Sequence, residues 1–264
     1  MTVRVHHLNC GSMRPLASPR MICHVLAVET DDGIVVVDTG FGLCDIEQPT
    51  RLGLMGKVLR PDLKYEETAI AQIEALDFDR RDVRHVVVTH LDLDHAGGIA
   101  DFPEATLHVT DSEYQYAGTA PGLSAKIRYG SWRSTPEPTV ERYAEFTTPW
   151  HGFDAAPVRG VGDSVLLVSL PGHTPGHAGV AVNTGDRWLL HCGDAFYHHA
   201  TIRGGSVPFV VRTSEGISAI SRRVAKDTRR RLSATFGTGE LPVDVVCAHD
   251  PVLLGDHKKT SGSG

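Results

Sequence analysis

The chain has 264 residues, of which 41% are hydrophobic and 22% are charged, so it is long enough to bury a substantial core. Its formal net charge of −6 gives it no general attraction to a nucleic-acid backbone. The arginine run at 229–231 is too local to change this, and we expect it to form the solvated face of a helix.

The first residues contain no apolar signal segment, and no apolar run approaches the roughly 20 residues that cross a membrane. We therefore expect a cytoplasmic protein. The five cysteines are widely spread, which argues against a disulfide framework and against a structural zinc knuckle. Histidine is the unusual residue: its 15 copies outnumber the 8 phenylalanines, and neutral imidazole is a common metal ligand.

Hydrophobic period and turn residues predict the secondary structure in chain order. Strands are expected at 3–9, 22–30, 34–38, 84–90, 106–110, 164–170, 178–182, 187–192 and 243–249. Helices are expected at 66–76, from Asp111 onward, and at about 214–232, with a long irregular stretch from about 117 to 162. We interpret 1–257 as a single domain and 258–264 as a disordered tail.

Two segments of the chain echo each other. DDGIVVVDTG at 31–40 and TGDRWLLHCGD at 184–194 each contain a turn, an apolar strand and then an aspartate near a glycine. The match is short, but it indicates an internal repeat.

Side chains that can bind a metal follow four of the apolar strands. They are His90, Asp92, Asp94 and His95, then His173, then Asp194, then His249. Loops that follow the strands of a rigid sheet commonly display functional groups. We therefore expect these residues to share one site.

The motifs THLDLDHAGG, PGHTPGH, GDAFY and AHDP, in this order, resemble those of the metallo-β-lactamase-fold hydrolases. The resemblance covers nearly the whole chain, and Asp38 in VVVDTG is similar to the family's structural aspartate. It implies an α/β fold, an αββα four-layer sandwich, with a dinuclear metal site at one edge. The opening HHLNCG, the HAGG and Tyr197 favour the N-acyl homoserine lactonase-like branch.

This resemblance implies a role for each residue of the set. One divalent ion would be held by His90, Asp92 and His173, the other by Asp94, His95 and His249, with Asp194 bridging the two. A metal-bound hydroxide would attack the acyl carbon of a lactone or related carboxylic ester. Asp94 would also orient the nucleophile, and Tyr197 would contact the substrate carbonyl or leaving oxygen unless it is a structural phenol. His177 is expected to orient a ligand.

Asp92 departs from the family pattern HxHxDH, in which a histidine occupies this position. Two divalent ions carry +4 and three aspartates carry −3, so one hydroxide makes the cluster neutral, whereas an all-histidine first site leaves it at +1. We expect a higher pKa of the bound water and a weaker Lewis acid. Zinc is the usual metal of the family, but the harder carboxylate favours manganese or iron. Alternatively, Asp92 turns away and only the second site fills.

Aromatic residues in the middle of the chain predict either an apolar wall beside the metals or a satellite core or subunit contact. They are Tyr114, Tyr116, Trp132, Tyr143, Phe146, Trp150 and Phe153. His198 and His199 are candidates for the pocket mouth. The expected partner is a small molecule with an apolar acyl or aromatic part, with no nucleic acid and no membrane; a homodimer is compatible with this interpretation.

Three other functions compete with the hydrolase. A di-iron or mononuclear-iron redox protein is suggested by the similar HxExDH motif of flavodiiron proteins, but this chain has no room for their flavodoxin-like domain. A nuclease is disfavoured by the acidic balance. The third is a catalytically weak binding or regulatory member with a site impaired by Asp92.

Overall fold

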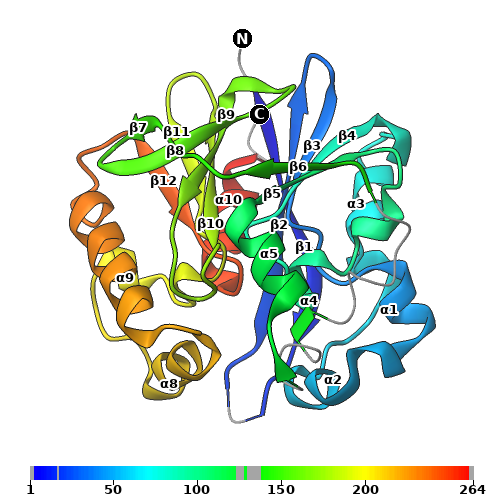
Figure 1. The fold of residues 1–264 in the computed structure, drawn as a ribbon, viewed down its shortest axis with the longest axis horizontal. Coiled ribbons are helices and arrows are strands. Elements are labelled where there is room, and N and C mark those ends of the chain that lie inside the picture. Colours follow the sequence, from blue (N-terminus) through cyan, green and yellow to red (C-terminus); the bar gives the residue numbers. More distant parts are fainter. Residues whose placement is uncertain (1–2, 17, 123–127, 130–137, 262–264) are drawn as a thin grey trace.

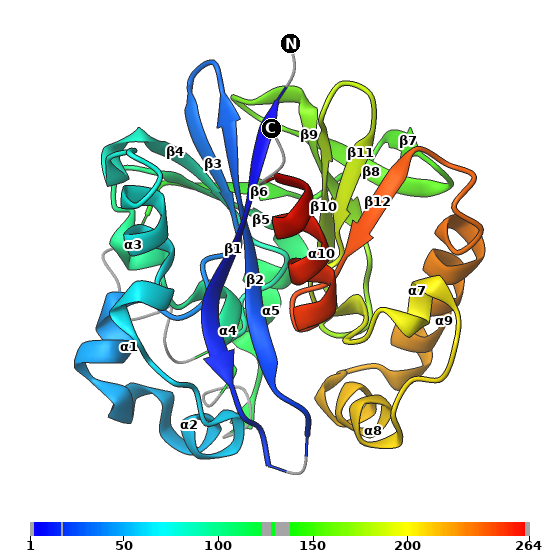
Figure 2. The same ribbon diagram turned by 180° about the vertical axis from the view of Figure 1, so that it is seen from behind.

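Two six-stranded mixed sheets face each other and carry helices on their outer sides, as Figures 1 and 2 show for the computed structural model. The structure describes residues 3–16, 18–122, 128–129 and 138–261. The four expected layers, helix, sheet, sheet and helix, are confirmed. None of the helices in these ranges is long and apolar enough to cross a membrane.

The first sheet contains the N-terminal strands in chain order. They are β1 (Arg4–Met13), β2 (Met21–Thr30), β3 (Gly33–Val37), β4 (Val83–Val87), β5 (Thr106–Thr110) and β6 (Val140–Tyr143). Neighbours from β1 to β3 pair antiparallel, and those from β3 to β6 pair parallel. The β-branched run at 34–37 is buried because β3 lies inside the sheet with layers on both of its faces.

The second sheet is built from the C-terminal half in the order β12-β11-β10-β9-β8-β7. Its strands are β7 (Thr148–Trp150), β8 (Phe153–Val158), β9 (Gly162–Ser169), β10 (Ala178–Asn183), β11 (Trp188–His191) and β12 (Val243–Val246). Only the β11 and β12 pair is parallel. Every predicted strand corresponds to an observed one, but β6, β7 and β8 lie in the stretch that we expected to be irregular.

The helices occupy the outer faces and the edge beside the sheets. They are α1 (Leu43–Glu47), α2 (Gly53–Leu59), α3 (Ala69–Glu74), α4 (Leu93–Ala96), α5 (Asp111–Thr119), α7 (Ala200–Arg203), α8 (Phe209–Ser218), α9 (Arg222–Phe236) and α10 (Pro251–Ser261). Short 3-10 turns are at Pro49–Leu52, Tyr65–Glu67, Arg80–Asp82, Ile99–Asp101 and Gly193–Ala195. α10 contacts β1 and β2 and includes 258–261, the first residues of the expected tail.

The predicted helix at 214–232 is wrong as a single element. The chain forms α8 and α9 instead, and Ser221 begins α9 by accepting a hydrogen bond from the backbone N–H of Val224. A serine side chain in this position accepts a hydrogen bond from a backbone N–H that has no partner inside the helix, so it commonly marks the start of a helix. The predicted helix at 66–76 is shorter, because the Thr68 side chain caps α3 in the same way.

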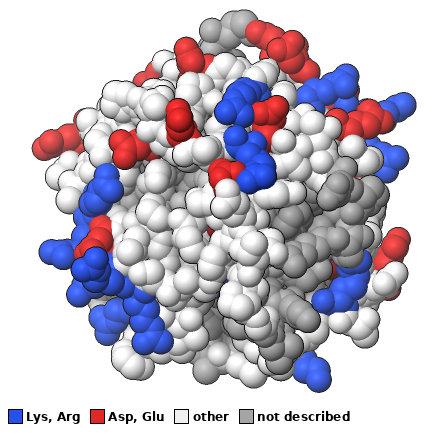
Figure 3. All heavy atoms as spheres, viewed as in Figure 1, with Lys and Arg blue, Asp and Glu red and all other residues white. Residues whose placement is uncertain are grey.

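The basic residues of α9 lie along one edge of the molecule, at the left of Figure 3. Arg230 and Arg231 are exposed, as the sequence predicted for a solvated helix face. Arg229 is different, because its side chain is half-buried and its Nε lies 3.9 Å from Glu215 Oε2.

The main core lies between the sheets and extends to α9, where Trp150 and Phe153 contact Phe236. A second core lies between the first sheet and its helices. Tyr143, Trp150 and Phe153 are buried in the main core, and Phe146 packs against it. Tyr114 and Tyr116 pack against the second core. The predicted apolar wall beside the metals is therefore wrong for these aromatics, because their side chains are packed between the layers of the fold and do not face the metal site. Trp132 lies outside the described residues.

The two echoing segments occupy matching places in the two sheets. β3 pairs antiparallel with β2 and parallel with β4, and β11 pairs antiparallel with β10 and parallel with β12. Asp38 follows β3, and Asp194 follows β11. The topology therefore supports the internal repeat that the sequence indicates.

Two buried carboxyl groups lie near the loop after β3. Asp45 accepts a hydrogen bond from the backbone N–H of Gly42, and Asp101 accepts one from that of Leu43. Burial raises the pKa of Asp101 to about 7, with Asp45 contributing like-charge repulsion, and burial raises the pKa of Asp45 to about 6.

These shifts predict a stabilising substitution. Because the folded pKa of Asp101 lies above its ordinary value, folding favours the protonated form, and stability falls as the pH rises from about 4 to about 7. Asp101→Asn keeps an acceptor for Leu43 without the charge, so we expect the free energy of unfolding to increase by about 1–3 kcal/mol at pH 8 and little at pH 4. Urea denaturation at both pH values measures this. The exposed Asp163→Asn is the control, and an equal effect of Asp101→Asn at both pH values would contradict the prediction.

Candidate metal centre

The loops that follow β4, β9, β11 and β12 converge at one edge of the two sheets. All the predicted site residues that can bind a metal are brought together there and are buried or nearly so. Their ligand atoms form two groups, each with its atoms within 4.8 Å of one another: His90, Asp92, His173 and Asp194, and then Asp94, His95 and His249.

The Asp194 carboxylate lies between the two groups. Its Oδ1 is 2.9 Å from His249 Nε2 and 3.1 Å from His95 Nε2. Its Oδ2 is 3.3 Å from His173 Nε2 and 3.9 Å from His90 Nε2. Burial alone would raise the pKa of Asp194, but the imidazoles, led by His249, outweigh it and hold this pKa well below its usual range. Each oxygen therefore faces a different group.

Asp92 faces the imidazoles of the first group. Its Oδ2 is 3.0 Å from His173 Nε2 and 3.2 Å from His90 Nε2. Its Oδ1 accepts a hydrogen bond from Nε of Arg128. Burial opposes ionisation, but Arg128 and His90 outweigh it and hold the pKa of Asp92 well below its usual range. Burial also lowers the pKa of His173 to about 4, so this imidazole is neutral at pH 7.

Contacts behind the imidazoles fix how the rings point. His95 Nδ1 is 2.8 Å from Asp38 Oδ2, and His249 Nδ1 donates to the backbone oxygen of Ile22 at 2.8 Å. Asp38 also accepts the backbone N–H of Thr89 at 2.7 Å. A hydrogen bond at Nδ1 sets the tautomer and directs Nε2 into the site.

His177 holds the backbone of Asp194 in place. Its Nδ1 donates to the Leu170 carbonyl at 2.9 Å, and its Nε2 accepts the backbone N–H of Asp194 at 3.0 Å. The preceding Gly193 has φ +50°, and a Cβ there would meet His177 Nε2 at 2.8 Å. Only glycine fits this close approach without strain. The place of His177 agrees with its expected role of orienting a ligand.

Tyr197 reaches both groups from the loop after β11. Its hydroxyl donates to Asp194 Oδ2 at 2.9 Å and lies 2.9 Å from Ser218 Oγ. The ring is 4.9 Å from that of His249 and 6.4 Å from that of His173, measured between centroids. Burial, together with the Asp194 charge, raises the pKa of the phenol well above its usual value, so it remains a donor.

Three side chains of the site, of which Glu113 is buried and Arg128 and Ser218 are partly buried, were missed in the sequence. Arg128 contacts both Asp92 and His173, and Ser218 contacts Tyr197. Glu113 accepts a hydrogen bond from the backbone N–H of Leu91 and thereby holds the segment that carries His90 and Asp92. No motif spacing identifies Arg128 or Ser218, but Glu113 lies in the first turn of a helix that was predicted.

An apolar cluster lies beside the centre. Tyr197 belongs to a separate cluster whose other buried members are Met13, Met21, Cys23, Phe41, Leu52, Leu93 and Val211. This cluster, rather than the aromatics of the middle segment, supplies apolar surface next to the polar groups.

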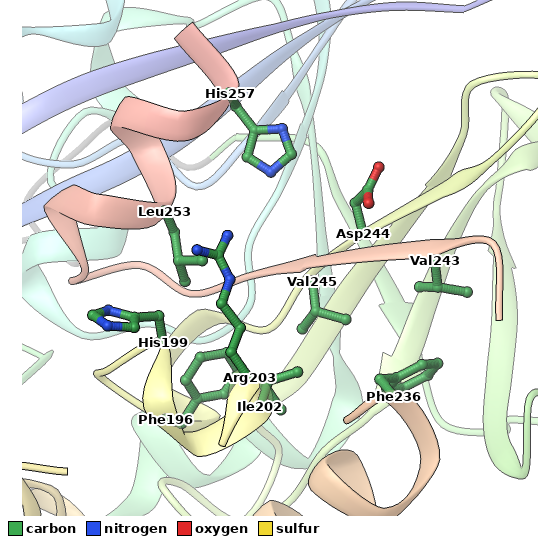
Figure 4. Close-up of a pocket in the computed structure, with 10 residues that line it drawn as sticks. All are labelled: Phe196, His199, Ile202, Arg203, Phe236, Val243, Asp244, Val245, Leu253 and His257. Atoms are coloured by element: carbon green, nitrogen blue, oxygen red, sulfur yellow. The ribbon is translucent and has the colours of Figure 1, made fainter. Parts of the chain in front are cut away.

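His198 and His199 lie apart from the two groups. They form a third set with Asp250, in which His199 Nδ1 is 2.8 Å from Asp250 Oδ2. His199 also lines a cavity of about 160 Å³ between α7, α10 and β12, shown in Figure 4. Its charged members are already paired, Arg203 with Asp256 and Asp244 with Arg187. This cavity holds no residue of the two groups.

Known proteins resemble this chain along most of its length. The profile of the Metallo-beta-lactamase superfamily matches residues 19–235. A probable metallo-hydrolase of Mycobacterium tuberculosis is 49% identical over 255 residues, which cover 95% of this chain and 81% of that protein. An N-acyl homoserine lactonase, AttM, of Rhizobium radiobacter is 30% identical over 221 residues, covering 83% of this chain and 73% of the relative.

A solved structure shares the fold. It is an N-acyl homoserine lactone hydrolase with the product N-hexanoyl-L-homoserine bound at its catalytic metal centre. The match has a TM-score of 0.69 at 20% sequence identity and covers 98% of this chain and 97% of that chain.

The hydrogen bonds of Asp38 with His95 and Thr89 predict that loss of this carboxylate lowers both the stability of the fold and the affinity for metal. Asp38→Ala leaves His95 Nδ1 and the Thr89 backbone N–H buried without their acceptor, which we expect to lower the free energy of unfolding by about 2–4 kcal/mol. Zinc affinity should fall about 10- to 100-fold because the His95 ring is no longer oriented. Chemical denaturation and zinc titration measure the two effects. Asp38→Asn, which keeps one acceptor oxygen, should lose less, and unchanged zinc affinity in Asp38→Ala would refute the orienting role.

Proposed function

Since this chain belongs to the metallo-β-lactamase superfamily and is a metallo-hydrolase related to the N-acyl homoserine lactonases, we propose that it hydrolyses a lactone or a closely related carboxylic ester. The observation that carries the proposal is Asp194, whose two oxygens face two separate groups of imidazoles. A carboxylate in this position suits a pair of cations.

The donor set fits two divalent ions. Nε2 of His90, Nε2 of His95 and Oδ1 of Asp194 are buried and make no hydrogen bond of good geometry to any described residue, although Asp194 Oδ1 lies within 3.1 Å of two imidazole nitrogens. Buried polar atoms without partners are costly unless a ligand satisfies them. Proteins of this superfamily bind a dinuclear metal site, often of zinc. We assign His90, Asp92 and His173 to one ion, Asp94, His95 and His249 to the other, and Asp194 to both.

The nitrogen and oxygen donors suit zinc, manganese or iron. Such ions, when bound, polarise a carbonyl group and acidify water. Asp92 brings a harder oxygen donor, which favours manganese or iron at the first position. We retain zinc as the first ion to test because it is common in this superfamily.

The chain's own residues then position the reaction. Asp94 Oδ2 lies 3.7 Å from His249 Nε2, within the second group, and this position supports our assignment of Asp94 as the residue that orients the attacking water. We assign the protonated Tyr197 hydroxyl as the donor to the substrate carbonyl or to the leaving alkoxide, which requires it to exchange its hydrogen bond to Asp194 Oδ2 for one to the substrate. Phe41, Leu93 and Val211 belong to the buried apolar cluster around Tyr197, and we propose that the acyl chain of the substrate packs beside this cluster.

The proposal is tested with metal-stripped protein reloaded with zinc, manganese, iron(II) or cobalt. N-acyl homoserine lactones of short and long acyl chain and simple aryl esters are the substrates, and a phosphodiester is the control. We expect turnover of at least one lactone that depends on added metal. Absence of turnover with any lactone or ester, with metal bound, would contradict the proposal and favour a binding or regulatory protein. The Arg128 contacts with Asp92 and His173 are the one observation that favours this second candidate.

Tyr197→Phe tests the proposed donor. The ring keeps its packing but loses the hydroxyl, so we expect kcat to fall at least about tenfold while zinc stoichiometry stays unchanged. Steady-state kinetics and metal analysis measure this. Tyr116→Phe, at a residue that packs against the second core on the far side of the first sheet, is the matched control and should leave kcat unchanged. An unchanged kcat in Tyr197→Phe would leave the phenol only a structural role.

A further inference from the structure

Arg128 places a permanent positive charge on the first group. Its side chain is only 15% exposed. Nε donates to Asp92 Oδ1 at 2.5 Å, one terminal nitrogen lies 2.5 Å from His173 Nε2, and the other donates to the Ser218 carbonyl at 2.9 Å. All three nitrogens of the guanidinium therefore have acceptors, and two of these acceptors are proposed ligands of the same ion.

The two ligands respond differently to an ion. Asp92 can serve both partners, because Oδ1 faces Arg128 while Oδ2 faces the imidazoles. His173 cannot, because a neutral imidazole has one nitrogen with a free lone pair, and that nitrogen either accepts an N–H or binds an ion. The Arg128 contact with His173 and the binding of an ion by His173 are therefore mutually exclusive.

The positive charge of Arg128 also opposes binding of an ion by the first group. The guanidinium stays protonated throughout the accessible pH range and repels a divalent ion placed next to it. Among the described residues, no arginine or lysine forms an ion pair with the second group, and the charged partners of His95 and His249 outside the group are the carboxylates of Asp38 and Asp194. The two groups thus differ in the charge that faces them.

We infer that Arg128 is a built-in competitor for the first metal ion. When that ion is absent, the guanidinium holds Asp92 and His173. When the ion binds, Arg128 leaves His173 and keeps Asp92, so the first site is the weaker of two and the second fills before it. This inference rests on the proposed dinuclear centre. The inference also explains why an aspartate occupies position 92. Its carboxylate neutralises the charge of Arg128, which a histidine at this position could not do.

Zinc binding to the stripped, full-length protein tests the inference. Titration in competition with a chromophoric chelator should give two Kd values at least about tenfold apart. Arg128→Gln should tighten the weaker Kd at least about tenfold and leave the tighter one unchanged. Arg229→Gln is the control, because Arg229 is similarly buried, at 18% exposed, but pairs with Glu215. Unchanged or weakened binding in Arg128→Gln would overturn the inference, whereas failure of the wild type to bind zinc would overturn the proposed centre itself.

A second measurement uses the wild-type chain and does not depend on how the variant folds. Anomalous scattering from crystals grown with one equivalent of zinc should place the ion among Asp94, His95 and His249. Two equivalents should fill both sites and move the Arg128 guanidinium away from His173. Filling of the first site before the second, or zinc at His173 with the Arg128 contact intact, would contradict the inference.

The pairing of Arg128 with Asp92 is tested by a double-mutant cycle. In the Asp92→His background, Arg128 faces imidazoles without its carboxylate, so Arg128→Gln should tighten the weaker zinc Kd by a larger factor than it does in the wild type. Equal factors in both backgrounds would show that the two side chains act independently.

Discussion

The centre depends on one buried carboxylate that four imidazoles surround. Asp194 comes from the second sheet, whereas His90 and His95 come from the loop after β4 in the first sheet. A charge in this position is stable only if partners from both sheets are present, because an isolated buried carboxylate is strongly disfavoured. The packing of the two sheets and the assembly of the polar site are therefore one event. His177 and Gly193 add to this by fixing the backbone from which Asp194 projects.

Much of this arrangement could be predicted because it follows from local patterns. Apolar strands that end in polar motifs place His90, His173, Asp194 and His249 at strand ends, and the sheet then brings these ends to one edge. β6, β7 and β8 were not predicted, because their residues show no clear period of two. The break between α8 and α9 could have been predicted from Ser221, which caps α9, but the helical spacing of the apolar residues continues across this position and favoured a single helix.

Arg128 could not be predicted from local patterns at all. Its partners Asp92 and His173 are 36 and 45 residues away in sequence. Arg128 also changes the net charge expected for the cluster. Its positive charge lies beside Asp92 and cancels the negative charge that this carboxylate adds to the first site. The expected rise in the pKa of the bound water relative to HxHxDH relatives therefore loses its electrostatic basis.

The anchor of His249 links the site to a distant part of the chain. Its Nδ1 donates to the backbone oxygen of Ile22 in β2, 227 residues away in sequence, and α10, which follows His249, contacts β1 and β2. A substitution that loosens α10 from the first sheet is therefore expected to disturb an imidazole of the second group, although none of the ligand residues lies in this helix.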